Sequence, residues 1–172
     1  LIVDSTKTAA RTTTSINVKR PENASAQGID VSYHQGVINW EKVKNTGKVD
    51  FAIIRCGYGM NEWNETTQTW TQDDPQWEYN TSECERLNIP YGVYLYSYAD
   101  TTEKAKSEAE HVIRMLEGKN LSYPIYYDME DKSVMNNSKI TAAKASQIAQ
   151  TFLNTMKAAG YNNLGVYSSK YY

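Results

Sequence analysis

Two carboxylates separated by a single residue follow an apolar run near the middle of the chain. Residues 125–131 read IYYDMED, a pattern typical of a short strand that ends in acids. Alternate residues of a strand share a face, so Tyr126, Asp128 and Glu130 are expected to point to one side. The two carboxylates then lie about 7 Å apart at the backbone, and their repulsion raises the pKa of one of them. A glycosidase uses such a pair to keep a protonated general acid beside an ionised partner near neutral pH.

The same acids allow two other interpretations. Solvated acids are common in loops at strand ends, and oxygens of Asp128, Glu130 and Asp131 would suit Mg²⁺ or Ca²⁺. No His or Cys cluster has the spacing of a zinc site. A second signal comes from Asp30, because an acid inside the apolar start GIDVS of residues 28–32 is costly unless it is paired or functional. We expect Asp30 and Asp128 near the same mouth of a sheet.

Strands and helices alternate along the chain. Strands are expected at 29–33, 51–56, 91–97, 124–128 and 164–168, and helices at 39–44, 75–87, 100–117 and 141–159. This alternation predicts right-handed βαβ units around a parallel sheet, the α/β class. Asp100 and Glu103 form a capping-box-like start of the third helix. The polar stretch 57–73 is expected to be a loop, in which Trp63 and Trp70 stack on sugar or simply pin the loop.

Composition is that of an ordinary globular protein of 172 residues, with 40% hydrophobic and 22% charged residues. A net charge of −2 without a basic stripe gives no reason to expect a nucleic-acid or anionic-membrane partner. No apolar run approaches the roughly 20 residues of a membrane span. Residues 1–26 have the Ser-, Thr- and Ala-rich composition of a linker or a poorly anchored arm, and the start at Leu1 is too short for the apolar core of a signal peptide.

Tyrosine dominates the aromatic residues, with 14 Tyr against 4 Trp and 2 Phe. A tyrosine ring can stack and hydrogen-bond at once, as sugar sites require, although Tyr can also replace Phe at half-wet strand ends. Cys56 lies in an apolar run, which favours free thiols at Cys56 and Cys84 over a disulfide. His34 and His111 are not expected to be catalytic, and His111, among Glu and Arg on a helix, is expected to be exposed.

Four segments in a fixed order make a family resemblance specific. They read GIDVSYHQG at 28–36 followed by INW at 38–40, FAIIR at 51–55, YGVYLYSYA at 91–99 and YYDME at 126–130. Together they resemble glycoside hydrolase family 25, the Chalaropsis-type muramidases, from about Gly28 to the end of the chain. The resemblance implies a flattened, modified (β/α) TIM-like barrel of eight strands with no metal or organic cofactor. About five of these strands are present, so 27–172 is expected to be a catalytic domain whose last strands lie beyond Tyr172.

The resemblance also implies roles for individual residues. Glu130 matches the general acid, Asp128 the companion that orients or stabilises the 2-acetamido group, and Asp30 a third acid on the floor of the site. Tyr94 and Tyr167 match tyrosines that contact the sugar.

Two further residues are expected to bind substrate. Tyr126 shares a face with the two acids. Arg55 shares a face with Phe51 and Ile53, where it would counter the buried acids or form a structural ion pair.

The implied substrate is the β-1,4 bond between N-acetylmuramic acid and N-acetylglucosamine in peptidoglycan. An Asp-x-Glu pair on one strand suits neither of the usual two-carboxylate geometries, which favours assistance by the substrate's own acetamido group. The alternative is a catalytically silent peptidoglycan-binding module. We further expect a secreted or cell-wall-associated protein that is a monomer at full length.

Overall fold

A computed structural model describes residues 23–135 and 140–168 of the chain. Most of the predicted arm, residues 1–22, therefore lies outside the described residues. The main sheet has five strands in the order β1-β2-β5-β6-β7, all paired in parallel. The strands are β1 (Gly28–Val31), β2 (Phe51–Tyr58), β5 (Tyr91–Tyr96), β6 (Ile125–Asp128) and β7 (Leu164–Tyr167). The predicted α/β class with a parallel sheet is confirmed, and closure into an eight-stranded barrel stays a prediction.

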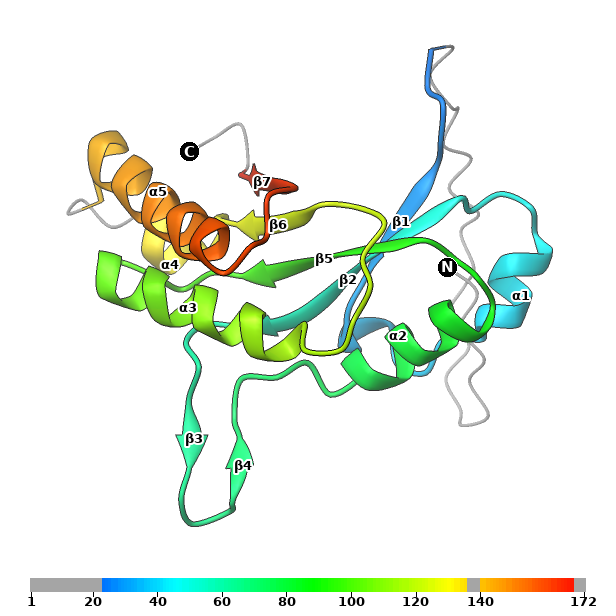
Figure 1. Cartoon of the computed structure of the whole chain (residues 1–172), viewed down its shortest axis with the longest axis horizontal. Helices are drawn as coiled ribbons and strands as arrows, with labels where there is room; N and C mark the ends of the chain where they lie inside the picture. The colour runs from blue at the N-terminus through cyan, green and yellow to red at the C-terminus, as the bar shows by residue number, and fades with distance from the viewer. Residues whose placement is uncertain (1–22, 136–139, 169–172) are drawn as a thin grey trace.

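The four predicted helices follow their strands, and a further short helix at Lys132–Met135 was not predicted. They are α1 (Trp40–Asn45), α2 (Trp77–Arg86), α3 (Thr102–Met115), α4 (Lys132–Met135) and α5 (Ala142–Ala158), with a short 3₁₀ turn at Tyr33–Gln35. Figure 1 shows α2, α3 and α5 together on one side of the sheet. Among the described residues, no helix is long and apolar enough to cross a membrane.

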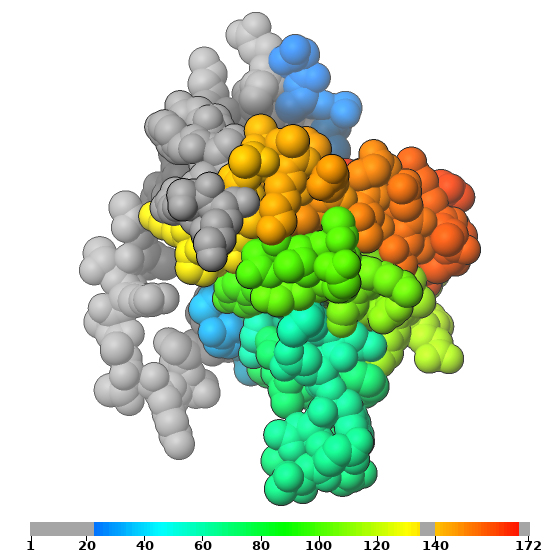
Figure 2. Space-filling model, turned by 90° about the vertical axis from the view of Figure 1, so that its left-hand side faces the viewer, coloured from blue at the N-terminus to red at the C-terminus, as the bar shows by residue number. Residues whose placement is uncertain are grey.

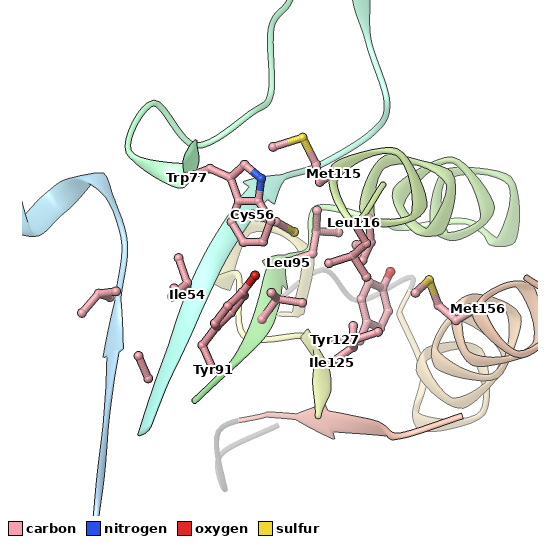
Figure 3. Close-up of a cluster of buried hydrophobic side chains, with 14 of the residues drawn as sticks. Ile54, Cys56, Trp77, Tyr91, Leu95, Met115, Leu116, Ile125, Tyr127 and Met156 are labelled. Carbon is pink, nitrogen blue, oxygen red and sulfur yellow. The ribbon is translucent and has the colours of Figure 1, made fainter. Parts of the chain in front are cut away.

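The core lies between the sheet and these helices. Alternate residues of β2, β5 and β6 enter it, among them Ile54, Leu95 and Tyr127, all fully buried. From the helix side, Phe152 of α5 stacks on the Tyr127 ring at 3.9 Å between centroids. Figure 3 shows Ile54, Leu95 and Tyr127 among the side chains of this core. Cys56 and Cys84 are buried in the same core as free thiols, as expected.

The start of α3 differs in detail from the prediction. Thr101, and not Asp100, caps the helix by accepting a hydrogen bond from the Lys104 amide at 3.3 Å. Asp100 instead forms an ion pair with the Lys104 side chain at 2.8 Å. The two residues are adjacent and both types cap helices well, so composition alone does not choose between them.

The polar stretch after β2 was predicted as a loop, but it contains a two-stranded hairpin. Strands β3 (Trp63–Asn64) and β4 (Thr69–Trp70) pair antiparallel, with Trp63 opposite Trp70. The hairpin projects beyond the sheet (Figures 1 and 2). The Trp63 and Trp70 rings meet edge to face with centroids 5.2 Å apart, and the Arg114 guanidinium lies 4.0 Å from the Trp70 ring centroid. The two Trp rings therefore hold the strands of the hairpin together, and Trp70 also anchors the hairpin to α3.

His111 was predicted to be exposed and is instead completely buried. Its Nε2 lies 2.8 Å from Asp73 Oδ1 and its Nδ1 lies 3.1 Å from the Gly59 carbonyl oxygen. A side chain at Gly57 would collide with the ring, because an added Cβ would sit 2.5 Å from His111 Cε1. Asp73 and Gly59 lie 38 and 52 residues earlier in the chain, so the helical neighbours of His111 could not reveal its burial.

Candidate active site

A cleft of about 470 Å³ lies on the face of the sheet opposite the buried core. Its walls come from β1, β2, β5, β6 and β7 and from the segments that follow β1 and β6. The lining residues are Asp30, His34, Ile53, Arg55, Tyr94, Tyr96, Tyr126, Asp128, Glu130 and Tyr167. All seven residues that the sequence singled out as catalytic or substrate-binding are among them.

Strand register explains why these residues meet. Arg55 of β2 pairs with Tyr94 of β5, which pairs with Tyr126 of β6. Two residues further along, Asp128 of β6 pairs with Tyr167 of β7. Residues two apart share a face, so the two rows stack along the same open side of the sheet. The predicted alternation in β6 is confirmed, because Tyr127 is buried on the opposite, core side.

Asp128 is the most perturbed acid of the cleft. Although Asp128 lines the cleft, it is only 6% exposed. Burial, together with the charges of Glu130 and Asp30, raises the pKa of Asp128 to about 7. Its Oδ1 is buried and has no hydrogen-bond partner in the described part of the chain. The raised pKa that was expected for one acid of the Asp-x-Glu pair is therefore that of Asp128. Asp128 is the more buried of the two acids, and Glu130 is half-buried.

Asp30 differs from the expectation of an acid enclosed by an apolar strand. It is exposed, because β1 is an edge strand of the described sheet and the Asp30 side chain faces the open cleft. Exposure removes the desolvation cost that drew attention to this residue. Asp30 still lies close enough to Asp128 to raise its pKa, so the two acids share one mouth as predicted.

Arg55 combines both of its predicted roles. Its Nε donates a hydrogen bond to Asp74 Oδ2 at 2.8 Å, and both side chains are buried. The same carboxylate oxygen accepts a hydrogen bond from the Tyr33 amide at 3.0 Å. Arg55 also lines the cleft, where its positive charge lowers the pKa of Asp128 against the larger effects that raise it. The ion pair thus fixes a cation beside the buried acids.

The sequence did not identify His34, Ile53 and Tyr96 as cleft residues. Tyr96 carried a usable signal, because it lies two residues after Tyr94 in the same strand and therefore shares its face. His34 follows β1 in the 3₁₀ turn, where strand alternation no longer applies.

A metal site built on the Asp128 segment finds no support in the geometry. Asp131 Oδ1 accepts hydrogen bonds from the amides of Ser133 and Val134 at 2.9 and 3.2 Å, so it caps α4. Among the described residues, no group of three or more His, Cys, Asp or Glu side chains is arranged to hold a metal ion.

Residues 29–172 match the sequence model of glycosyl hydrolases family 25. The chain belongs to this family. The family match covers four strands of the sheet in full, β1 except for Gly28, and every residue that lines the cleft. No curated protein sequence matches the chain.

Solved structures agree with the family. The chain is 38% identical to the modular autolysin LytC from Streptococcus pneumoniae, with a TM-score of 0.72 over 86% of this chain and 33% of that one. A second structure of LytC, in complex with a synthetic peptidoglycan ligand, is 37% identical over 84% of this chain and 32% of that one, with a TM-score of 0.70. The spore cortex lytic enzyme SleM from Clostridium perfringens shares the fold, with a TM-score of 0.71 at 18% identity over 89% of this chain and 47% of that one. The chain spans about a third of the length of LytC.

Proposed function

We propose that the protein is a peptidoglycan hydrolase that cleaves the β-1,4 bond between N-acetylmuramic acid and N-acetylglucosamine. The observation that carries the proposal is the cleft that holds Asp128, the last residue of β6, with a pKa raised to about 7, together with Glu130 from the segment that follows β6. Membership of glycosyl hydrolase family 25 and the peptidoglycan ligand in the related LytC structure support the same substrate class. The protein then acts outside the cell or at the cell wall, as a monomer.

In this proposal, Glu130 is the general acid. Its half-buried carboxyl protonates the oxygen of the leaving sugar as the glycosidic C–O bond breaks. The carbonyl oxygen of the substrate's 2-acetamido group attacks the anomeric carbon and forms a cyclic intermediate. Water then opens that ring and gives a proton to the Glu130 carboxylate, so the acid is restored.

Asp128 stabilises the positive charge that spreads over the acetamido group during the attack. A carboxylate in a partly desolvated site interacts more strongly with such a charge than one in water. Burial and the charges of Glu130 and Asp30 disfavour the Asp128 anion and raise its pKa, and the positive charge that develops on the substrate would stabilise that anion. Asp30 adds negative charge at the same mouth, while Tyr94, Tyr126, Tyr167 and Arg55 contact the sugars.

Substrate assistance explains how two acids so close together at the end of β6 suffice. A retaining enzyme with a protein nucleophile needs carboxyl groups about 5–5.5 Å apart across the sugar, and an inverting one about 6.5–9.5 Å with room for water. Residues two apart on a strand approach the sugar from a shared side instead. The expected first product therefore retains its anomeric configuration, and ¹H NMR of the first-formed anomer tests this. An inverted product, or rapid cleavage of a substrate without the acetamido group, would contradict assistance but leave the bond assignment intact.

The bond assignment has its own test. Purified peptidoglycan is digested, the new reducing ends are reduced with borohydride, and the sugar alcohols are identified by mass spectrometry. We expect muramitol as the new end, and none with the Glu130→Gln variant. Glucosaminitol would show that the other glycosidic bond of the repeat is cleaved.

The alternative is a module that binds peptidoglycan without cleaving it. The presence of a half-buried Glu130 beside Asp128 favours the enzyme, because binding alone needs no proton donor. Sedimentation of the protein with insoluble peptidoglycan and no release of soluble fragments would favour the silent module.

A further inference from the structure

A group of tyrosine rings continues the cleft beyond its wall at Tyr96. It consists of Tyr33, from the turn after β1, Tyr58, at the end of β2, and Tyr98, just after β5. We call these three residues the tyrosine platform. None of them lines the cleft itself, and neither the family resemblance nor the cleft geometry gives them a role.

Strand register places the platform beside the acids. Tyr58 pairs with Tyr96 across β2 and β5, and Tyr96 pairs with Asp128 across β5 and β6. Tyr58 reaches this row because the pairing shifts between Arg55 and Gly57, where β2 carries an irregularity that changes which of its residues face the cleft. A row of side chains therefore runs from Asp128 to Tyr58 along one side of the sheet.

The rings of the platform also contact one another and the cleft. The Tyr96 and Tyr98 rings meet edge to face with centroids 5.3 Å apart, and the Tyr58 and Tyr98 rings do so at 6.3 Å. The Arg55 guanidinium lies 4.8 Å from the Tyr33 ring centroid and 5.5 Å from the Tyr58 ring centroid. Since Tyr96 and Arg55 both line the cleft, the platform is continuous with it.

Much of the platform surface is available to a ligand. Tyr33 and Tyr98 are each 43% exposed although they are large aromatic residues. In the described part of the chain, the structure gives neither of their hydroxyls a hydrogen-bond partner. The ion pair with Asp74 fixes the Arg55 guanidinium beside the Tyr33 and Tyr58 rings. A rigid ring face beside a hydroxyl suits a sugar, which offers C–H groups and hydroxyls together.

We propose that the tyrosine platform is a subsite for a further sugar ring of the same glycan strand, outside the cleft in which the bond is cleaved. A cleft of about 470 Å³ holds a small ligand, so a polymer must leave it across a rim. The rim formed by β1, β2 and β5 presents aromatic rings and the cation Arg55, whose charge is paired with Asp74. Such a surface can bind a neutral N-acetylated sugar. The inference rests on the proposed function, because it takes the glycan as the ligand.

The test compares glycans of two lengths. The probes are peptidoglycan-derived disaccharides and hexasaccharides, and their affinities are measured by titration calorimetry in a Glu130→Gln background that does not consume them. Tyr98→Ala and Tyr33→Ala remove rings from different elements, and Tyr98→Phe keeps the ring but loses the hydroxyl. We expect each Ala variant to weaken hexasaccharide binding about fivefold and to leave disaccharide binding unchanged. Tyr98→Phe should keep most of the hexasaccharide affinity.

The outcomes separate the subsite from the proposed function. Equal loss of affinity for both lengths, or no loss in either Ala variant at unchanged melting temperature, would overturn the subsite. Use of both Tyr33 and Tyr98 keeps the test decisive if one variant folds poorly. Undiminished cleavage by Glu130→Gln would instead contradict the proposed mechanism, and a length-dependent effect of Tyr98 on binding would still support the platform.

Discussion

The Tyr127 hydroxyl donates a hydrogen bond of 2.5 Å to Glu108 Oε2 in the core, behind the strand that carries Asp128. The Ser97 hydroxyl donates to the same oxygen at 2.8 Å, and the Tyr98 amide donates to Oε1 at 2.8 Å. These donors come from the ends of β5 and β6, whereas Glu108 comes from α3. Because Tyr127 and Asp128 are consecutive residues, the network that holds Tyr127 also fixes the direction in which Asp128 enters the cleft.

Removal of the Glu108 carboxylate should destabilise the fold. Glu108→Ala leaves three donors without their acceptor, two of them on buried residues, and each unsatisfied buried group costs about 1–3 kcal/mol. We expect a loss of roughly 3 kcal/mol or more in the free energy of unfolding, measured by chemical denaturation. Glu108→Gln keeps the size of the side chain and should lose less. A Glu108→Ala variant within about 1 kcal/mol of the wild type would contradict the network's importance.

Asp128 should make stability depend on pH. Burial raises its folded pKa to about 7 from a reference value of 3.8, so the folded state binds the proton more tightly than the unfolded state. The stability that this proton provides is complete below the unfolded pKa and is lost as pH rises through about 7. Asp128→Asn cannot ionise and should escape the loss. We expect the variant to gain on the order of 2–4 kcal/mol relative to the wild type between pH 4 and pH 8.

Thermal or chemical unfolding of both proteins at several pH values checks the Asp128 prediction. A difference between Asp128→Asn and the wild type that stays constant from pH 4 to pH 8 would show that the carboxyl titrates near its ordinary range.

Asp30 should shift the pH dependence of activity. Its charge raises the pKa of Asp128, and the proposed mechanism needs Asp128 ionised. Asp30→Asn therefore lowers the pKa of Asp128 and should move the acidic limb of the kcat/KM profile to lower pH, even if the maximum rate falls. The exposed Glu110 of α3 offers a matched control, because Glu110→Gln removes the same charge far from the cleft. An acidic limb that moves equally in both variants would contradict the coupling.

The hairpin should depend on Asp73. Burial alone would raise the pKa of Asp73, but hydrogen bonds from His111 and Arg114 outweigh burial and lower it. A lowered pKa means stability that is present above the unfolded value and lost as pH falls through the folded value. Asp73→Asn should therefore speed amide hydrogen exchange at residues 61–72, and acid should do the same in the wild type. Exchange in this segment that is identical in Asp73→Asn and the wild type at pH 7 would show that other contacts hold the hairpin.

Local periodicity was enough to predict most of the site. The alternation in residues 126–130 correctly assigned Asp128 to the cleft side and Tyr127 to the core, because strand geometry is set by neighbouring residues. Tyr58 could not be predicted in this way, since the irregularity after Arg55 breaks the alternation. The predicted exposure of His111 was wrong for a different reason. Its partner Asp73 lies 38 residues away in the chain, and the charged residues beside it on the helix suggested a solvent-exposed position.

The roles of the acids come from the family resemblance, and the structure adds the environment in which they act. Composition alone would have left the Asp-x-Glu pair as an ordinary acidic strand end. The exposure of Asp30 depends on β1 being an edge strand of the described sheet, which no local pattern in residues 28–32 reveals.

Glu130 gives the most direct test of the central claim, that Asp128 at the end of β6 and Glu130 just after it hydrolyse the glycan. The Glu130→Gln variant keeps the shape of the side chain but cannot donate a proton in the same way, and loss of a general acid lowers rates by about 10²–10⁴-fold. The measurement is kcat on purified peptidoglycan together with calorimetric binding of a hexasaccharide, with Glu110→Gln, which alters an exposed acid of α3, as the control. We predict that Glu130→Gln loses at least about 100-fold in kcat with unchanged affinity, while the control stays within a few-fold of the wild type. A Glu130→Gln variant that keeps more than about a tenth of the wild-type kcat would contradict the account.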